Sequence, residues 1–392
     1  MKNLLPNLSV LTRRLLILAL VWTAALMILG AYVRLQDAGL GCPDWPGCYG
    51  HLGVPDEAHE IAHAETRFGM EVDSAKGWKE MIHRYVAGGL GLLMLVLTAL
   101  LWRDRRQASQ SGWPALLPLA VIVLQGAFGM WTVTLKLMPI VVTGHLIGGM
   151  TLLMILLVLA SRAMPRWDSL AESLSNRAKV FQQGTGAADS TSRTPRRGND
   201  AGRGGLRPKL LLVYLPRWRA LWQLALLLVM VQIVLGGWVS TNYAALACDG
   251  FPQCQGQWAI PGGLDYLQDA LRPDRELGMS ASGEALSLQH LAAIHWLHRL
   301  GALLLSLALL GLIVQLWRPA PRYARSILAA LLLQLGLGVG NVIFSLPLAL
   351  ALAHHAGAVL LLGLLVHGYC RLPALQQKSF EYPNLRQQEA AT

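Results

Sequence analysis

Residues 80–84 read Glu-Met-Ile-His-Arg, and residues 295–299, which lie 215 positions further along the chain, read His-Trp-Leu-His-Arg. A second motif, Gln-x-x-x-Gly, occurs at 125–129 and again at 334–338, an offset of 209. Two motifs that recur in the same order indicate an internal duplication, and a duplication determines the architecture of the whole chain. The sequence therefore predicts two copies of one structural unit.

Each copy contributes two histidines at matching places. The first copy has His83 and His145, and the second has His298 and His354. The offset of 209 between the Gln-x-x-x-Gly motifs identifies His354, rather than its neighbour His355, as the equivalent of His145.

The composition is that of a membrane protein. Of the 392 residues, 54% are hydrophobic and 14% are charged, and the mean hydropathy is +0.43, which is too apolar for a soluble globule. Eight apolar runs have about the 20 residues that cross a hydrocarbon core of roughly 30 Å. They lie at 13–34, 81–102, 114–135, 140–161, 219–240, 295–317, 325–346 and 349–370. The first run has full length and no small-residue cleavage site, so we expect a retained helix rather than a signal peptide.

These runs predict an all-α membrane protein with eight transmembrane helices, arranged as two tandem four-helix-bundle repeats. The first repeat covers 1–161 and the second covers 219–392. The segment 162–218 between them is basic, and much of it is rich in Gly, Ser, Thr and Arg. Such a composition buries too little apolar surface to fold alone. We expect this segment to be a cytoplasmic linker.

Charge is distributed unequally between the connections. Basic residues cluster at the amino terminus, at 103–106, at 162–219 and at 318–325, whereas acidic residues gather at 37–73 and 249–284. In an eight-helix count all the basic segments fall on one side, which predicts cytoplasmic termini and outward-facing acidic connections. The net charge of +11 is thus explained by topology. Nucleic-acid binding is not expected, because the Arg-rich stretch has little aromatic interleaving.

All four histidines then fall near the outer ends of predicted spans, with His83 and His298 in the first turn of theirs. A histidine inside a membrane helix is costly and usually functional. Neutral imidazole is a common iron ligand, and two histidines on neighbouring helices can hold a haem from both faces. An interfacial histidine bonded to a backbone carbonyl is the simpler alternative for any single one. Four at matched positions favour two haem sites.

The copies differ at one position that bears on chemistry. Glu80 lies one helical turn before His83, whereas its counterpart is His295. A carboxylate beside a metal site can accept a proton, which suggests one catalytic half and one electron-handling half. Alternatively, Glu80 is an exposed acid at a helix start. Arg84 and Arg299 suit haem propionates, and snorkelling to the interface is the other interpretation.

Four of the five cysteines form two Cys-x5-Cys pairs, Cys42 with Cys48 and Cys248 with Cys254. Both pairs fall in outward connections, where an oxidising compartment allows disulfides. A structural staple is the expected role, and a redox role is the alternative. The fifth, Cys370, is expected to be inert.

The string Gly-Leu-Gly-Cys-Pro-Asp-Trp-Pro-Gly-Cys at 39–48, together with the motifs at 80–84, 125–145 and 334–354, resembles the haem A synthase family. The resemblance covers both repeats but not the linker. It implies an enzyme that oxidises the C8 methyl of haem O to a formyl group by successive hydroxylations, after which a geminal diol loses water.

The resemblance also implies residue roles. His83 and His145 would hold the iron of the substrate haem O, and His298 and His354 would hold a resident haem b. Glu80 would assist proton removal or stabilise a cationic intermediate. The Cys42–Cys48 disulfide would carry electrons or position the substrate.

The implied setting is a bacterial inner membrane with the active site facing the periplasm. The expected partners are haem O, the membrane haem O synthase that delivers it, lipid and an electron acceptor that the sequence does not identify. A homo-oligomer is left open. The alternatives are a transmembrane di-haem b-type electron carrier, which needs haems near opposite faces, and a haem carrier, which needs no Glu80. A quinone-dependent thiol oxidant is disfavoured by the cysteine spacing.

Overall fold

The computed structural model describes residues 8–108, 111–163, 208–273, 276–280, 283–318 and 320–389, with the side chains of 208–218 and 372–389 excepted. This part of the chain is all-helical and contains ten α-helices and no strand. They are α1 (Val10–Leu35), α2 (Ala58–Phe68), α3 (Ser74–Gln107), α4 (Leu116–Thr134), α5 (Pro139–Ala163), α7 (Pro208–Thr241), α8 (Leu264–Ala270), α9 (Leu288–Leu316), α10 (Pro321–Ile343) and α11 (Leu348–Glu389). Most of the predicted linker, 164–207, lies outside the described residues.

All the helices except α2 and α8 are long and apolar enough to cross a membrane, which confirms the eight predicted spans. Three of them begin well before the predicted position. Helix α3 begins at Ser74 rather than at 81, and α9 begins at Leu288 rather than at 295, so His83 and His298 lie between two and three turns from the start of their helices rather than in the first turn. Helix α7 begins at Pro208 rather than at 219. The short helices α2 and α8 were not predicted; they lie in the two cysteine-bearing connections.

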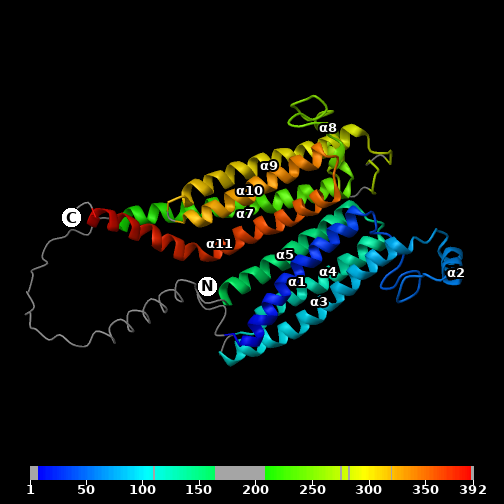
Figure 1. The fold of residues 1–392 in the computed structure, drawn as a ribbon, viewed down its shortest axis with the longest axis horizontal. Coiled ribbons are helices and arrows are strands. Elements are labelled where there is room, and N and C mark those ends of the chain that lie inside the picture. Colours follow the sequence, from blue (N-terminus) through cyan, green and yellow to red (C-terminus); the bar gives the residue numbers. More distant parts are fainter. Residues whose placement is uncertain are drawn as a thin grey trace, which may run out of the picture.

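The long helices form two groups of four (Figure 1). In the first group α1, α3, α4 and α5 form a ring in which each helix contacts the next, and α7, α9, α10 and α11 do the same in the second. The groups meet where α5 and α11 contact each other and where α1 packs on α11 and α5 on α7. Each group has its own apolar core, and Met150 of α5 joins the core of the second group.

Several helix ends are specified locally. The Ser9 hydroxyl accepts a hydrogen bond from Thr12 N (3.1 Å) at the start of α1, and Asp73 caps α3 by accepting from Lys76 N (2.9 Å). Two consecutive residues in the turn between α4 and α5, Lys136 and Leu137, have left-handed backbone. The turn between α10 and α11 repeats this unusual conformation 209 positions later.

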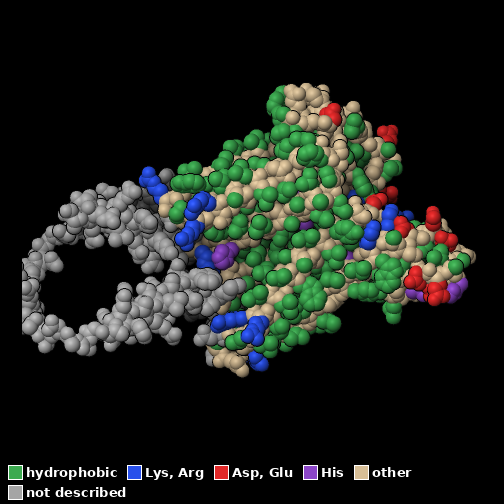
Figure 2. All heavy atoms as spheres, in the orientation of Figure 1, with side chains coloured by type: hydrophobic (Ala, Val, Ile, Leu, Met, Phe, Trp, Pro, Cys, Tyr) green, Lys and Arg blue, Asp and Glu red, His purple; other side chains and the backbone are tan. Residues whose placement is uncertain are grey.

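Charged side chains gather at opposite ends of the molecule (Figure 2). Many arginines and lysines lie at the end where α1 begins and others lie at the opposite end, whereas the acidic side chains in view gather at the end that carries α2 and α8 (Figure 2). The charge asymmetry predicted from the sequence is therefore present in the fold.

A cluster of polar contacts joins the two groups at the acidic end. We call it the Arg34–Tyr243 clasp. Arg34 Nη2 donates to the carbonyl of Ser240 (2.9 Å), and the guanidinium lies 4.1 Å from the centre of the Tyr243 ring. The Tyr243 hydroxyl donates to Asp37 Oδ1 (2.5 Å). Burial raises the pKa of the Tyr243 phenol, and the Asp37 carboxylate raises it further.

Candidate functional site

Each histidine of the first group faces a glycine on a neighbouring helix. His83 of α3 packs on Gly30 of α1, where a Cβ would lie 3.0 Å from the ring atom Cε1. His145 of α5 packs on Gly129 of α4, with a looser distance of 3.7 Å. The bare glycine backbone lets each ring lie in the seam between two helices.

The second group repeats this arrangement. His298 of α9 faces Gly236 of α7, and His354 of α11 faces Gly338 of α10, with Cβ-to-Cε1 distances of 3.2 and 3.0 Å. In each group, the two predicted histidines therefore lie in two different seams between neighbouring helices. His354, rather than His355, occupies the seam that corresponds to that of His145.

The ring nitrogens are suited to an additional ligand. Among the described residues, the buried Nδ1 atoms of His83, His145 and His354 have no hydrogen-bond partner. Buried polar groups are normally paired. Each helix group has two imidazoles with a glycine beside each ring, and three of the four rings have an unsatisfied nitrogen. These features fit the requirements of a bis-histidine haem.

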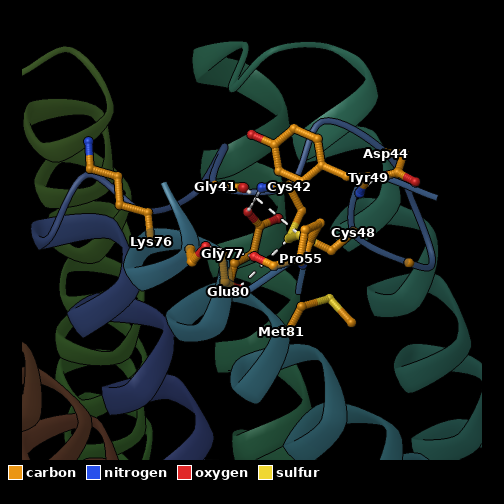
Figure 3. Close-up of a disulfide and its surroundings, with 12 residues drawn as sticks. Gly41, Cys42, Asp44, Cys48, Tyr49, Pro55, Lys76, Gly77, Glu80 and Met81 are labelled. Carbon is orange, nitrogen blue, oxygen red and sulfur yellow. Dashed lines mark hydrogen bonds between the residues drawn. A yellow bond between two sulfur atoms is a disulfide. The ribbon is translucent and has the colours of Figure 1, made fainter. Parts of the chain in front are cut away.

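Glu80 is buried, with 5% of its surface exposed, which excludes the exposed-acid alternative. Its Oε2 accepts a hydrogen bond from the backbone N–H of Cys42 (2.9 Å), drawn in Figure 3, and its Oε1 accepts from Arg84 Nη2 (2.5 Å). The carboxylate therefore connects α3 to the cysteine-bearing loop, one turn from His83.

That loop is closed by a disulfide between Cys42 and Cys48, both fully buried. It lies directly on α3: Cys42 Sγ is 3.8 Å from the carbonyl oxygen of Gly77, and a Cβ on Gly77 would lie 2.8 Å from the Val54 side chain. Figure 3 shows the disulfide beside Glu80 and Gly77. Gly77 therefore lets the cysteine-bearing loop pack closely against α3.

Arg84 holds the same loop from the other side. Its Nη1 donates to the carbonyls of Asp44 (2.9 Å) and Gly47 (2.6 Å). Since Nη2 is bonded to Glu80, the guanidinium is already engaged on both sides. Contact with a propionate stays a prediction for Arg84, and a role in holding the loop is what its present bonds indicate.

Inside the loop, Asp44 accepts hydrogen bonds from the backbone N–H groups of Tyr49 (2.6 Å) and Gly50 (2.7 Å). Burial raises the pKa of the Tyr49 phenol, and the nearby Asp73 and Asp44 carboxylates raise it further. The loop is therefore a compact unit with a neutral phenol beside its acidic groups.

The second cysteine loop has the same frame without the carboxylate. Cys248 and Cys254 form a disulfide next to the carbonyl of Ala292, and Arg299 Nη1 donates to the carbonyl of Gln253 (2.9 Å). His295 occupies the place of Glu80. Within the described residues, Arg299 Nη2 is buried and has no partner, so Arg299 remains a candidate for binding a propionate.

One residue of this site was missed from the sequence. Gln232 of α7 places its amide Nε2 3.0 Å from His298 Nδ1. The signal was available, because 232–236 reads Gln-x-x-x-Gly, as do 125–129 and 334–338.

Comparison with known proteins gives one family and a consistent set of relatives. The model of the COX15-CtaA family, described as cytochrome oxidase assembly protein, matches residues 13–186 and 202–366. A haem A synthase of Shewanella oneidensis is 40% identical over 360 residues, which cover 90% of this chain and 94% of the relative. Haem A synthases of Paracoccus denitrificans and Mesorhizobium japonicum are 28% and 24% identical, over 90% and 86% of this chain and 85% and 84% of theirs.

Proposed function

The chain belongs to the COX15-CtaA family of cytochrome oxidase assembly proteins, and we propose that it oxidises the C8 methyl group of haem O to the formyl group of haem A. It is a multi-pass membrane protein and an enzyme of haem A biosynthesis. The proposal of oxidation rests on one observation: the buried carboxylate of Glu80 lies one turn from His83. The second helix group has His295 at the corresponding position.

We infer that the two helix groups are tandem repeats with different tasks. The matching rings of helices and the left-handed turns that recur at an offset of 209 support the repeat. The first repeat, 1–161, would receive haem O between His83 and His145. The second, 219–392, would retain haem b between His298 and His354. A haem held in this way supplies iron-centred redox chemistry near the outer ends of the helices.

In this mechanism Glu80 would accept a proton from the methyl group that is oxidised. With water as the oxygen source, each hydroxylation converts a methyl C–H and a water molecule into C–OH, two protons and two electrons. Glu80 would take one of the protons, and the two electrons would pass to an external electron acceptor. The Cys42 N–H and Arg84 Nη2 orient the carboxylate from two sides. The disulfide keeps the donor N–H in place, and burial of the loop excludes bulk water from the carboxylate.

We also propose an orientation in the membrane. Because basic residues favour the cytoplasmic side, the basic end of the molecule and both termini would face the cytoplasm of a bacterium. The histidines and both cysteine loops would face the periplasm. Lipid would surround the helix groups, and a membrane haem O synthase would deliver the substrate.

A transmembrane di-haem electron carrier is the second candidate. Such a carrier needs haems near opposite membrane faces, whereas α3, α5, α9 and α11 all carry their histidine in the half nearest the acidic end. An electron carrier also has no need of a buried carboxylate such as that of Glu80. We therefore favour the synthase.

The test is to purify the protein from cells that make haem O and to separate its extracted haems by reversed-phase chromatography with mass detection. Haem b together with haem O, haem A or a hydroxylated intermediate is expected. Two haem b per chain, with no modified haem, would contradict the proposal and favour the electron carrier.

A further inference from the structure

Three of the four histidines share a second local feature beyond their glycine. In each case a glutamine side chain fills the space above a glycine that follows the histidine by three residues. A Cβ at that glycine would lie 1.7, 2.2 or 2.3 Å from the glutamine amide, so no other residue fits without a shift. The pairs are Gln125 over Gly148, Gln334 over Gly357, and Gln232 over Gly301.

The fourth histidine, His83, lacks both members of this pair. The position equivalent to Gln232, 206 residues earlier, is Leu26, and the position equivalent to Gly301, 215 residues earlier, is Val86. Glutamine and glycine are thus replaced together by two apolar residues. Because the glutamine and the glycine are either both present or both absent, we take them as one structural unit that belongs to the histidine seam.

The two repeats also differ in the hydrogen bonds that their histidine residues make. Gln232 Nε2 lies 3.0 Å from His298 Nδ1 and donates to the carbonyl of His298 (3.0 Å). Gln334 Nε2 donates to the carbonyl of His354 (3.0 Å) and lies 3.4 Å from its Nε2. In the first repeat, the described residues offer no hydrogen-bond partner to His83 Nδ1.

In the same repeat the side chain of Gln125 fills the space above Gly148, and its Nε2 makes no hydrogen bond to the described residues. Both its Nε2 and the Nδ1 of His145 are buried and lack a partner among the residues that the structure describes. In the second repeat, glutamine side chains therefore bond both histidine residues, at a ring nitrogen of His298 and at the backbone carbonyl of His354. Among the described residues, no glutamine side chain bonds His83 or His145 in this way.

We propose that Gln232 is a positioning residue that makes the second repeat retain its haem, and that Leu26 leaves His83 as the ligand that releases iron when substrate and product exchange. The inference rests on the proposed function, in which one haem stays and the other turns over. A partner that fixes the orientation of a metal-binding imidazole commonly changes metal affinity by about 10- to 100-fold. For His298 to bind iron through Nε2, its Nδ1 must carry the proton, so the Gln232 amide would turn to present Oε1 as the acceptor and would give up its bond to the His298 carbonyl.

The first experiment uses the full chain with His83→Ala and His145→Ala, so that only the second repeat binds haem. When Gln232→Met is added to this double variant, the length of the side chain is kept. The transfer of haem b to excess apomyoglobin should then become about tenfold faster. The substitution should also alter the low-spin absorption and EPR spectra. The matched control is Gln223→Met on the same helix, where the glutamine is exposed and bonds the Tyr369 hydroxyl (3.2 Å); it should change neither.

The reciprocal experiment uses the full chain with His298→Ala and His354→Ala. Here Leu26→Gln combined with Val86→Gly installs the missing pair and should slow haem b loss from the first repeat about tenfold. Unchanged haem loss in both Gln232→Met and the Leu26→Gln, Val86→Gly protein would overturn the proposal. The proposal would also be overturned if haem loss became faster together with a lower thermal stability but without a change in the spectra. That result would mean that the glutamine only stabilises the packing of the helices.

The two parent proteins test the assignment of the repeats separately. The proposed function requires slower haem loss from the second repeat than from the first. If the order is reversed while the glutamine substitutions act as expected, the assignment of the resident haem fails and the role of Gln232 stands.

Discussion

A single exchange of residue type, Glu80 in one repeat for His295 in the other, separates the two sites chemically. We expect Glu80→Gln to keep haem bound, because the amide can still accept from Cys42 N–H and the histidines are unchanged. Haem A formation should fall at least about 100-fold, since a general base typically contributes 10²- to 10⁴-fold. The measurement is the ratio of haem A to haem O in haems extracted from the purified protein. Undiminished haem A would remove Glu80 from the mechanism.

The seam glycines give a second prediction at the residue scale. Gly338→Ala should lower the haem b content of the protein, because its Cβ would lie 3.0 Å from His354 Cε1 in a fixed helix pair. Gly129→Ala is the matched change in the first repeat and should be tolerated at 3.7 Å. Haem-to-protein ratios from pyridine haemochrome spectra compare the two. Equal losses would show that these distances do not govern haem binding.

At this scale the sequence predicted the residue types but not all of their contacts. Histidine spacing and the offset of 209 favoured His354 over His355, and His354 is the residue whose ring faces Gly338. The bonds of Arg84 to the carbonyls of the loop were not predictable, because they depend on the three-dimensional path of 44–47. Gln232 was missed because the repeat is imperfect there: its counterpart is Leu26.

At the scale of structural elements, the two disulfide loops are alike in frame and differ in what they contact. Opening either loop removes roughly 2 kcal/mol of chain-entropy stabilisation for so short a ring. We expect Cys42→Ser with Cys48→Ser to abolish most haem A formation as well, because the Cys42 N–H would no longer be held against Glu80. Cys248→Ser with Cys254→Ser should spare haem A formation.

Both double variants should be compared at matched haem b content, so that a general loss of folding is accounted for. The same chromatographic ratio of haem A to haem O is the readout. Equal loss in the two variants would mean that the first disulfide has no special relation to Glu80.

Hydropathy located the eight spans because each needs about 20 apolar residues, and that pattern is strong. It did not locate the beginning of α3, since the first turns from Ser74 are polar and the cap at Asp73 is a short-range signal. The helices α2 and α8 are short and mostly outside the apolar runs, so hydropathy gave no indication of them.

At the scale of the whole molecule, the Arg34–Tyr243 clasp links folding to alkaline pH. Its phenol has a pKa raised above the ordinary value of about 10, so ionisation is easier in the unfolded chain. The contribution of the clasp to stability is complete below pH 10 and is lost as pH rises through the folded-state pKa. Thermal unfolding in detergent, followed by circular dichroism, should therefore show a smaller alkaline loss for Tyr243→Phe than for the unmodified chain. An identical loss would contradict this role.

The arrangement of the two repeats was only partly predictable. Motif offsets predicted two copies of one unit, but apart from the clasp the helices that join the two groups, α1 and α5 with α7 and α11, contact each other largely through apolar side chains. Such surfaces carry no pairing code that a single sequence displays. The charge asymmetry between the two ends, in contrast, was predictable from the position of each basic and acidic segment.

The clasp also bears on the ancestry of the chain. Its partners are equivalent positions, since Arg34 meets Ser240 and Asp37 meets Tyr243, each 206 residues apart. In a symmetric dimer of one ancestral repeat, a residue on the symmetry axis faces its own copy, so two Asp37 carboxylates would repel each other. If the two helix groups descend from one repeat, joining them in a single chain removes this requirement for self-complementarity and lets the two sides mutate independently. A protein assembled from two first repeats would have lost the mutual fit that the fused pair has acquired.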